Sequence, residues 1–144
     1  FLMMGAGMTL GGHMAQTGRF SWAAIAAGIP AALLMTLILY TNNLRDLDSD
    51  RLAGLHTLPM LFKPAEAKAL ALVILAVAYV LTGMMAGTGQ LPRATQLCFL
   101  TLPLAVKWAL RIWRKPAAER DVVGMAQLHM AFGLLYAAGL WINR

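Results

Sequence analysis

The sequence predicts an all-α protein, a multi-span bundle of transmembrane helices. Of its 144 residues, 60% are hydrophobic and only 12% are charged, which is more apolar than an ordinary soluble domain. A helix needs ~20 mostly apolar residues to cross a hydrocarbon layer of about 30 Å. Residues 1–15 have the composition of the end of one such helix. Four further segments are long enough to form full spans, namely 22–41, 66–87, 94–113 and 124–142.

The boundaries of these segments carry ordinary signals of helix ends and turns. The first span is preceded by Gln16-Thr17-Gly18, which predicts a turn. Pro64 and Glu66 suit the first turn of the second span, where proline is tolerated and a carboxylate faces the positive end of the helix dipole. Pro30 and Pro103 lie inside predicted spans, so both of those helices are expected to kink.

The distribution of charge predicts the orientation. Most basic residues lie in the connections 42–65 and 114–123 or directly beside them, and alternating spans place both connections on one side. The positive-inside rule makes that side cytoplasmic. All six carboxylates fall there too, so topology explains the net charge of +6 and no nucleic-acid partner is expected. Tyr40, near a span end, is predicted to belong to an aromatic belt at the interface.

An acidic cluster follows the first full span. Asp46, Asp48 and Asp50, half of the carboxylates of the chain, occur within five positions. Carboxylates so close repel one another unless cations or solvent compensate them, and at a membrane interface a divalent metal with an anionic ligand is one such compensation. If the preceding helix continues, Asn42, Asp46 and Asp50 share one face and Asp48 points roughly the other way.

That geometry matches the needs of Mg²⁺. The ion takes one or two carboxylates, keeps waters and shares phosphate oxygens of a substrate, so Asp46 and Asp50 would suffice with the amide oxygen of Asn42. Arg45 and Arg51 flank the cluster and are placed to reach phosphate. The alternative is a solvated helix end with Asp/Arg pairs, which surface helices often show.

The same run resembles a known motif. The stretch from Asn42 to Arg51, followed by Ala53-Gly54, is similar to the second Asp-rich motif of the UbiA-type intramembrane prenyltransferases. Its N-N-x-R-D opening is most similar to the 1,4-dihydroxy-2-naphthoate polyprenyltransferases of menaquinone synthesis. The runs 103–107 and 127–135 also resemble the last two helices of that family. The resemblance implies that residues 1–144 are the C-terminal half of one nine-helix domain. An apolar start at Phe1 without a basic region agrees with this reading.

The resemblance implies an activity, namely Mg²⁺-dependent transfer of a polyprenyl group from polyprenyl diphosphate to 1,4-dihydroxy-2-naphthoate. The expected location is the plasma membrane of a bacterium, in contact with lipid and with the Asp-rich loop in the cytoplasm. Because the family uses two Asp-rich motifs and this chain holds one, residues 1–144 alone are expected to be inactive. The implied catalytic residues and metal ligands are Asp46 and Asp50, with Asn42 as a further ligand, and the implied diphosphate-binding residues are Asn43, Arg45, Arg51 and Lys107.

Other interpretations remain open. Leu55 stands where the family usually has a lysine, and the resulting pattern also resembles prenyltransferases of chlorophyll, tocopherol and other quinone pathways. Lys107 also has a simpler explanation, because near a span end it can extend to the interface. A CDP-alcohol phosphotransferase lacks support, because its D-G-x-x-A-R run is missing. A non-enzymatic membrane subunit or ion carrier is the last alternative, although carriers commonly place carboxylates at mid-membrane.

Overall fold

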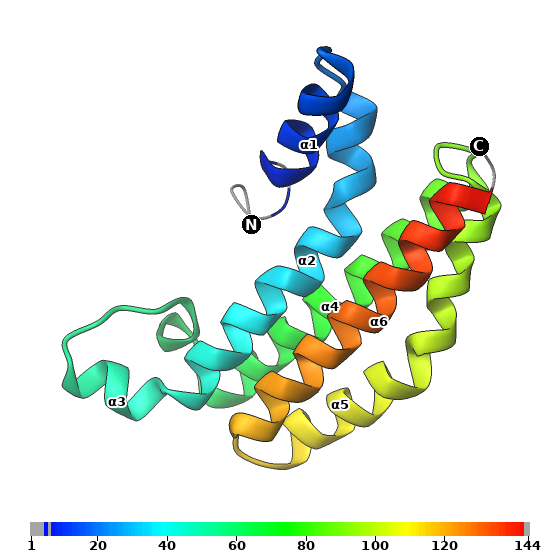
Figure 1. The fold of residues 1–144 in the computed structure, drawn as a ribbon. Coiled ribbons are helices and arrows are strands. Elements are labelled where there is room, and N and C mark those ends of the chain that lie inside the picture. The colour runs from blue at the N-terminus through cyan, green and yellow to red at the C-terminus, as the bar shows by residue number, and fades with distance from the viewer. Residues whose placement is uncertain (1–4, 6, 143–144) are drawn as a thin grey trace.

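The computed structural model describes residue 5 and residues 7–142, and across these residues the chain is helical and contains no strand. The predicted all-α fold is therefore confirmed (Figure 1). The elements in chain order are α1 (Met8–Thr17), α2 (Trp22–Arg45), α3 (Leu47–Leu52), η2 (Leu58–Leu61), α4 (Pro64–Gly87), η3 (Arg93–Thr101), α5 (Leu102–Arg114) and α6 (Glu119–Ile142), where η marks a 3₁₀-helix.

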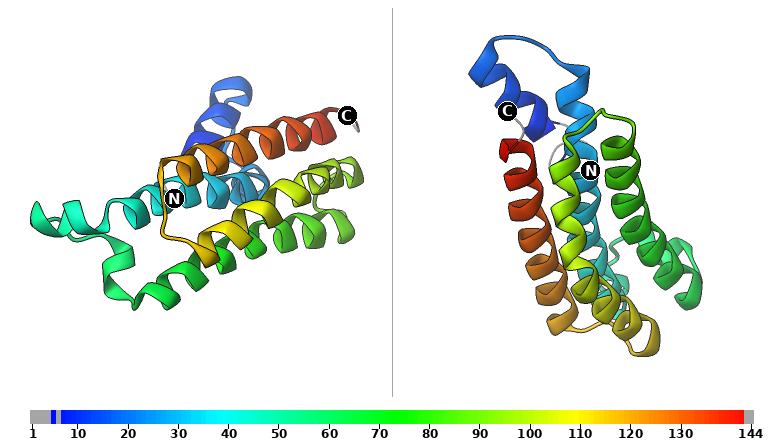
Figure 2. Two further views of the ribbon diagram at one scale, coloured as in Figure 1. Left: turned by 90° about the horizontal axis from the view of Figure 1, so that it is seen from below. Right: turned by 90° about the vertical axis from the view of Figure 1, so that its right-hand side faces the viewer.

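Four helical rods form the body of the molecule. They are α2, α4, the continuous pair η3 and α5, and α6, and each packs beside its neighbour in sequence. The last rod closes the bundle, because α6 packs against both η3 and α2 (Figures 1 and 2). Helix α1 packs only on α2 among these rods, and α3 extends away from the bundle at the opposite end.

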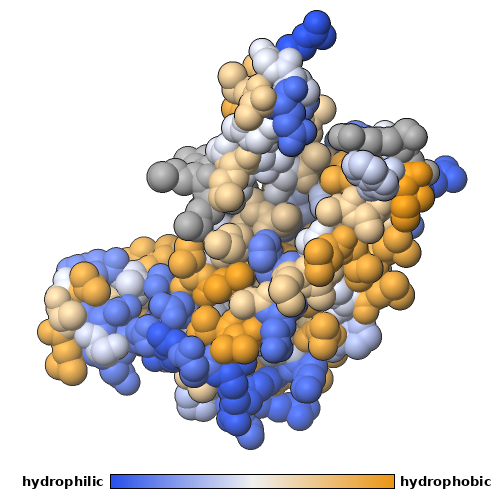
Figure 3. Space-filling model, in the orientation of Figure 1, coloured by the Kyte–Doolittle hydropathy of each residue, from blue (hydrophilic) through white to orange (hydrophobic). Residues whose placement is uncertain are grey.

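Three helices, α2, α4 and α6, are long and apolar enough to cross a membrane, each with 24 residues. Helix α2 contains the predicted span 22–41, α4 contains 66–87 and α6 contains 124–142. Many large apolar side chains on these helices face outward, which suits contact with lipid. On the face shown in Figure 3, hydrophilic residues gather at the end of the bundle that carries α3 and the α5–α6 connection.

The segment 94–113 differs from the single α-helix that the sequence predicts. It is a 3₁₀-helix up to Thr101 and an α-helix from Leu102 onward. Pro103 contributes to the change, since it has no N–H to donate to the carbonyl of Phe99 as an α-helix would require. Leu102 instead donates its N–H to the carbonyl of Phe99, one residue closer than an α-helix requires. Pro103 thus lies in the first turn of α5, where proline is tolerated.

Tyrosine and tryptophan side chains connect the rods. Tyr40 of α2 donates to the carbonyl of Ala67 in α4 at 2.9 Å. The hydroxyl of Tyr136 in α6 donates to the carbonyl of Ala27 in α2 at 2.7 Å. Both tyrosines are buried, so the prediction that Tyr40 lies in an interfacial belt is wrong. These bonds satisfy polar groups inside the bundle, where water is not available to do so.

One close approach between rods depends on a glycine. Gly139 of α6 lies against the backbone of η3, and a Cβ built there would stand 2.5 Å from the Cα of Thr95. Small residues allow this kind of close backbone contact between membrane helices. The contact therefore requires a residue without a side chain at position 139.

We expect Gly139→Ala to destabilise the protein by about 1–3 kcal/mol, because the methyl group meets backbone that cannot rotate away. Gly133→Ala in the same helix is the matched control, since a Cβ there meets nothing within 4 Å. Thermal unfolding in detergent measures both. Equal midpoints for the two variants would contradict the tight α6–η3 contact.

Candidate functional site

The Asp-rich run lies at a break between two helices. Helix α2 ends at Arg45, and Asp46 has a non-helical backbone with φ of −95° and ψ of 11° before α3 begins. The helix therefore does not continue unbroken through the run, as the sequence analysis assumed. The reason is the pairing of Arg45 with Asp46, because adjacent side chains on a regular helix do not face each other.

Despite the break, the three predicted metal ligands Asn42, Asp46 and Asp50 are still spaced one helical turn apart. Asp46 donates its N–H to the carbonyl of Asn42 at 3.0 Å, and Asp50 donates its N–H to the carbonyl of Asp46 at 2.8 Å. Each residue therefore follows the previous one by a single helical turn. The backbone still presents one amide and two carboxylates in succession.

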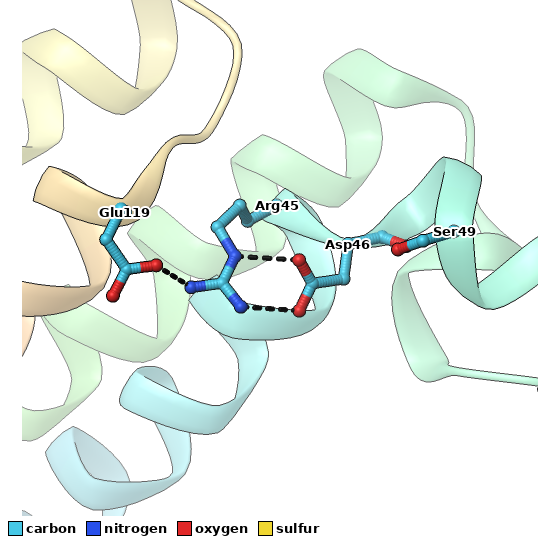
Figure 4. A network of polar contacts seen from close by, with 4 residues as sticks. All are labelled: Arg45, Asp46, Ser49 and Glu119. Atoms are coloured by element: carbon cyan, nitrogen blue, oxygen red, sulfur yellow. Dashed lines mark hydrogen bonds and ion pairs between the residues drawn. The ribbon is translucent and has the colours of Figure 1, made fainter.

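Arg45 is the centre of a network of charges (Figure 4). Its Nε donates to Oδ1 of Asp46 and its Nη2 donates to Oδ2, each at 2.7 Å, which makes a bidentate pair. The remaining nitrogen, Nη1, donates to Oε2 of Glu119 at the start of α6. A single guanidinium thus joins the end of α2 to the start of α6. Ser49 adds a bond from its hydroxyl to the backbone carbonyl of Asp46 at 2.9 Å.

This pairing sets the charge state of Asp46. Hydrogen bonds from the Arg45 guanidinium, aided by its positive charge, hold the pKa of the Asp46 carboxyl below its usual value. Asp46 is therefore an anion at neutral pH, as a metal ligand must be.

The other predicted ligands differ from Asp46 in their surroundings. Asn42, Asn43 and Asp50 are partly buried, whereas Arg51 is exposed. Among the described residues, none of these four side chains makes a hydrogen bond or ion pair. Within the same part of the chain, no group of three or more His, Cys, Asp or Glu side chains converges. An ion held here would therefore rest on two carboxylates and an amide.

A pocket of about 300 Å³ lies beside this network, between the α2–α3 break, the start of α4 and the α5–α6 connection. Arg45, Asp48 and Lys68 supply its charged lining. Asp46 and Asp50 do not line this pocket, which agrees with the expectation that Asp48 faces another way. Lys107 lies in a different pocket, between α5 and α6, so the structure does not bring it together with the Asp-rich run.

Several charged contacts at this end of the bundle were not predicted from the sequence. Glu119 binds Arg45 across 74 positions, a separation that no local pattern reveals. Lys68 donates to the carbonyl of Lys115 at 2.8 Å and so holds the C-terminal end of α5. Asp121 is buried and accepts from Arg111 and from the N–H of Ala118. The only available signal was the presence of two acidic residues in the first turn of α6, where the helix dipole favours them.

Comparison with known proteins identifies the family. The model of the UbiA prenyltransferase family matches residues 1–142. The chain belongs to the UbiA prenyltransferase family. The predicted resemblance is thereby confirmed, and the Asp-rich run lies within the matched region.

Individual UbiA-family relatives come from animals and bacteria. The chain is 31% identical over 130 residues to UbiA prenyltransferase domain-containing protein 1 of Gallus gallus, covering 90% of this chain and 38% of that protein. The Danio rerio protein of that name is 33% identical, covering 89% and 37%. 1,4-Dihydroxy-2-naphthoate octaprenyltransferase of Bacillus subtilis (strain 168) is 29% identical, covering 99% and 47%. The chain therefore spans less than half the length of these relatives.

We expect Arg45→Gln to raise the pKa of Asp46 toward the ordinary aspartate value of about 3.9, because the bidentate partner is removed. The stability that the pair supplies is present above that ordinary value and is lost as pH falls through the lowered pKa of Asp46. Carbon NMR of the Asp46 carboxyl group measures the titration. Glu119→Gln is the control, because it leaves both bonds to Asp46 in place. An unchanged titration in Arg45→Gln would contradict the pairing.

Proposed function

We propose that this chain supplies one diphosphate-holding motif of an enzyme that transfers a polyprenyl group from polyprenyl diphosphate to an aromatic acceptor. Membership of the UbiA prenyltransferase family supports the reaction class. The observation that carries the proposal is the network of Arg45 and Asp46, which places a guanidinium and ionised carboxylates together at the end of an apolar bundle.

The donor set fits a bound Mg²⁺. Asn42, Asp46 and Asp50 offer hard oxygen ligands on successive turns, and two carboxylates are enough when substrate phosphate completes the coordination. When bound, the ion supplies a Lewis acid that withdraws charge from the leaving diphosphate. Both oxygens of Asp46 accept hydrogen bonds from Arg45, so a cation at this carboxylate would either share those oxygens with the guanidinium or displace it.

The basic residues have a matching role toward diphosphate. Arg45 offers a planar fork of donors that suits phosphate as well as carboxylate, so it is able to exchange one partner for the other. Glu119 keeps Arg45 near the motif through Nη1 during such an exchange. Arg51 is exposed, and Asn43 lies next to the ligand Asn42, so both are proposed to contact the diphosphate. Lys107 is assigned no role here, since it lines another pocket.

The acceptor is proposed from the relatives and from the motif. 1,4-Dihydroxy-2-naphthoate is the first candidate, because the Bacillus subtilis relative is named for it and the N-N-x-R-D run is similar to that group. This assignment makes the chain part of menaquinone synthesis. The identity of 29% also leaves room for an acceptor of another quinone, tocopherol or chlorophyll-type pathway.

The complete active site is proposed to need a second Asp-rich motif. A departing diphosphate carries several negative charges, and in the described part of the chain the basic residues near Asp46 are few, namely Arg45, Arg51 and, across the neighbouring pocket, Lys68. The partly buried Asn42 and Asn43 also require polar neighbours in a membrane. We therefore propose that residues 1–144 act together with further helices and have no transferase activity alone.

We expect Asp46→Asn to lower the turnover of the complete enzyme by about 100-fold or more, about 3 kcal/mol of transition-state stabilisation, because a metal ligand is lost. Asp48→Asn is the matched control and should cost far less, since Asp48 does not belong to the Asn42–Asp46–Asp50 series. Prenyl transfer to dihydroxynaphthoate in membranes gives the rates, and Mn²⁺ binding by electron paramagnetic resonance reports the metal. Similar small losses in both variants would contradict the assignment of ligands.

The structure suggests how to test the orientation. Both basic connections lie at one end of the bundle, where Lys68 contacts Lys115 and Arg45 contacts Glu119, and we propose that this end is cytoplasmic. Ser49→Cys should then react with a membrane-impermeant thiol reagent only after the cells are opened. Gln90→Cys, at the exposed turn after α4, should react in intact cells. Labelling of Ser49→Cys in intact cells would show that this end of the bundle faces the outside and would contradict the proposed orientation.

A further inference from the structure

A second pocket, of about 230 Å³, lies between α5 and α6. From α5 it is lined by Leu104, Lys107, Trp108 and Arg111, which share one face of the helix at spacings of three and four residues. From α6 it is lined by residues of the first three turns, namely Arg120, Asp121, Gly124 and Gln127. The pocket is therefore at the charged end of the bundle, on a face that the Asp-rich run does not occupy.

The pocket carries uncompensated positive charge. Lys107, Arg111 and Arg120 contribute three positive charges and Asp121 contributes one negative charge, which leaves two positive charges. Arg111 is the compensated member, because its Nε and Nη2 donate to the buried carboxylate of Asp121. Lys107 and Arg120 are exposed and make no ion pair among the described residues. Two free cationic groups thus flank one neutralised pair.

The other end of the pocket is apolar. Leu104 and Arg111 are separated by two helical turns, or about 10 Å along the axis. Trp108 lies between them, and its indole N–H donates to the backbone carbonyl of Asp121 at 2.9 Å. That bond fixes the position of the ring, whose carbon atoms then line the pocket. Along α5 the lining therefore runs from Arg111 at the charged end of the bundle to Leu104 at the other end, with Lys107 and Trp108 between them.

We propose that this pocket binds the phosphate group of an anionic phospholipid, whose acyl chain extends along Leu104 and Trp108. Lys107 and Arg120 pair with the phosphate, and Gln127 adds an amide donor. Basic pockets between membrane helices at the cytoplasmic face suit such headgroups. A free phosphate has no apolar group that could contact Leu104 and Trp108. The proposal does not depend on the catalytic one, because no residue of the Asp-rich run takes part.

Native mass spectrometry of the whole protein in detergent tests the proposal, with phosphatidylglycerol and phosphatidylcholine of equal acyl chains as the probes. Each basic residue is worth about a factor of five in affinity, so Lys107→Ala with Arg120→Ala should weaken binding of phosphatidylglycerol about 30-fold. Arg114→Ala with Lys115→Ala is the matched control. It removes two exposed charges from the same end of the bundle, outside the pocket, and should change the affinity less than twofold.

Three outcomes would overturn the proposal. Equal weakening in both double variants would show diffuse attraction by the basic loop. Equal binding of the two lipids by the unmodified protein would show an apolar groove without headgroup recognition. Displacement of phosphatidylglycerol by inorganic pyrophosphate at lower concentrations than the lipid itself would show a site for free diphosphate. If the alanine pair does not fold, Lys107→Gln with Arg120→Gln removes the same charges with more of each side chain kept.

Discussion

The arrangement of the charged end of this molecule depends on one guanidinium, that of Arg45. Because it binds Asp46 through two parallel hydrogen bonds, the backbone at Asp46 leaves helical geometry and α3 begins in a new direction. Because its third nitrogen binds Glu119, the start of α6 is held beside the end of α2. Arg45 therefore binds two carboxylates at once, at the break between α2 and α3 and beside the neighbouring pocket.

The membrane explains why the charges lie together. All six carboxylates lie between Asp46 and Glu66 or at Glu119 and Asp121, at the end of the bundle where the connections meet, and the apolar middles of the helices contain none. A charge in the hydrocarbon layer is costly unless it is paired or reaches water. Asp121 shows the stricter form of this rule, because it is buried and accepts hydrogen bonds from Arg111 and Ala118. The residues available for function at this end are therefore charged residues, which are costly to place in the interior of the bilayer.

The sequence was sufficient to predict features that depend on local pattern. Long apolar stretches located α2, α4 and α6. The sequence did not predict the break at Asp46, because the geometry expected for the Asp-rich run assumed a continuous helix. It did not predict that Pro103 converts the preceding turns to a 3₁₀-helix, since proline in a membrane helix is also compatible with a simple kink. Tyr40 was placed at the interface for its position near a span end, whereas the structure buries it through a bond to Ala67. Such partners lie far away in sequence and are found only when the helices are packed.

The role of Arg45 unites two interpretations that the sequence presented as alternatives. The first is an Asp/Arg pair at a solvated helix end, and the second is a pair of carboxylates that binds a cation. The two appear to exclude each other, because the arginine neutralises the carboxylate charge that the cation requires. An aspartate is already ionised at neutral pH, and the pair favours that form further, since its hydrogen bonds lower the pKa of the carboxyl group. An ionised carboxylate whose partner is itself able to bind phosphate is a suitable resting state for a site that receives a cation together with a diphosphate. If a cation and a diphosphate bound here, Asp46 would offer carboxylate oxygens to the cation, Arg45 would offer its guanidinium to the diphosphate, and Glu119 would keep its bond to Nη1 of Arg45.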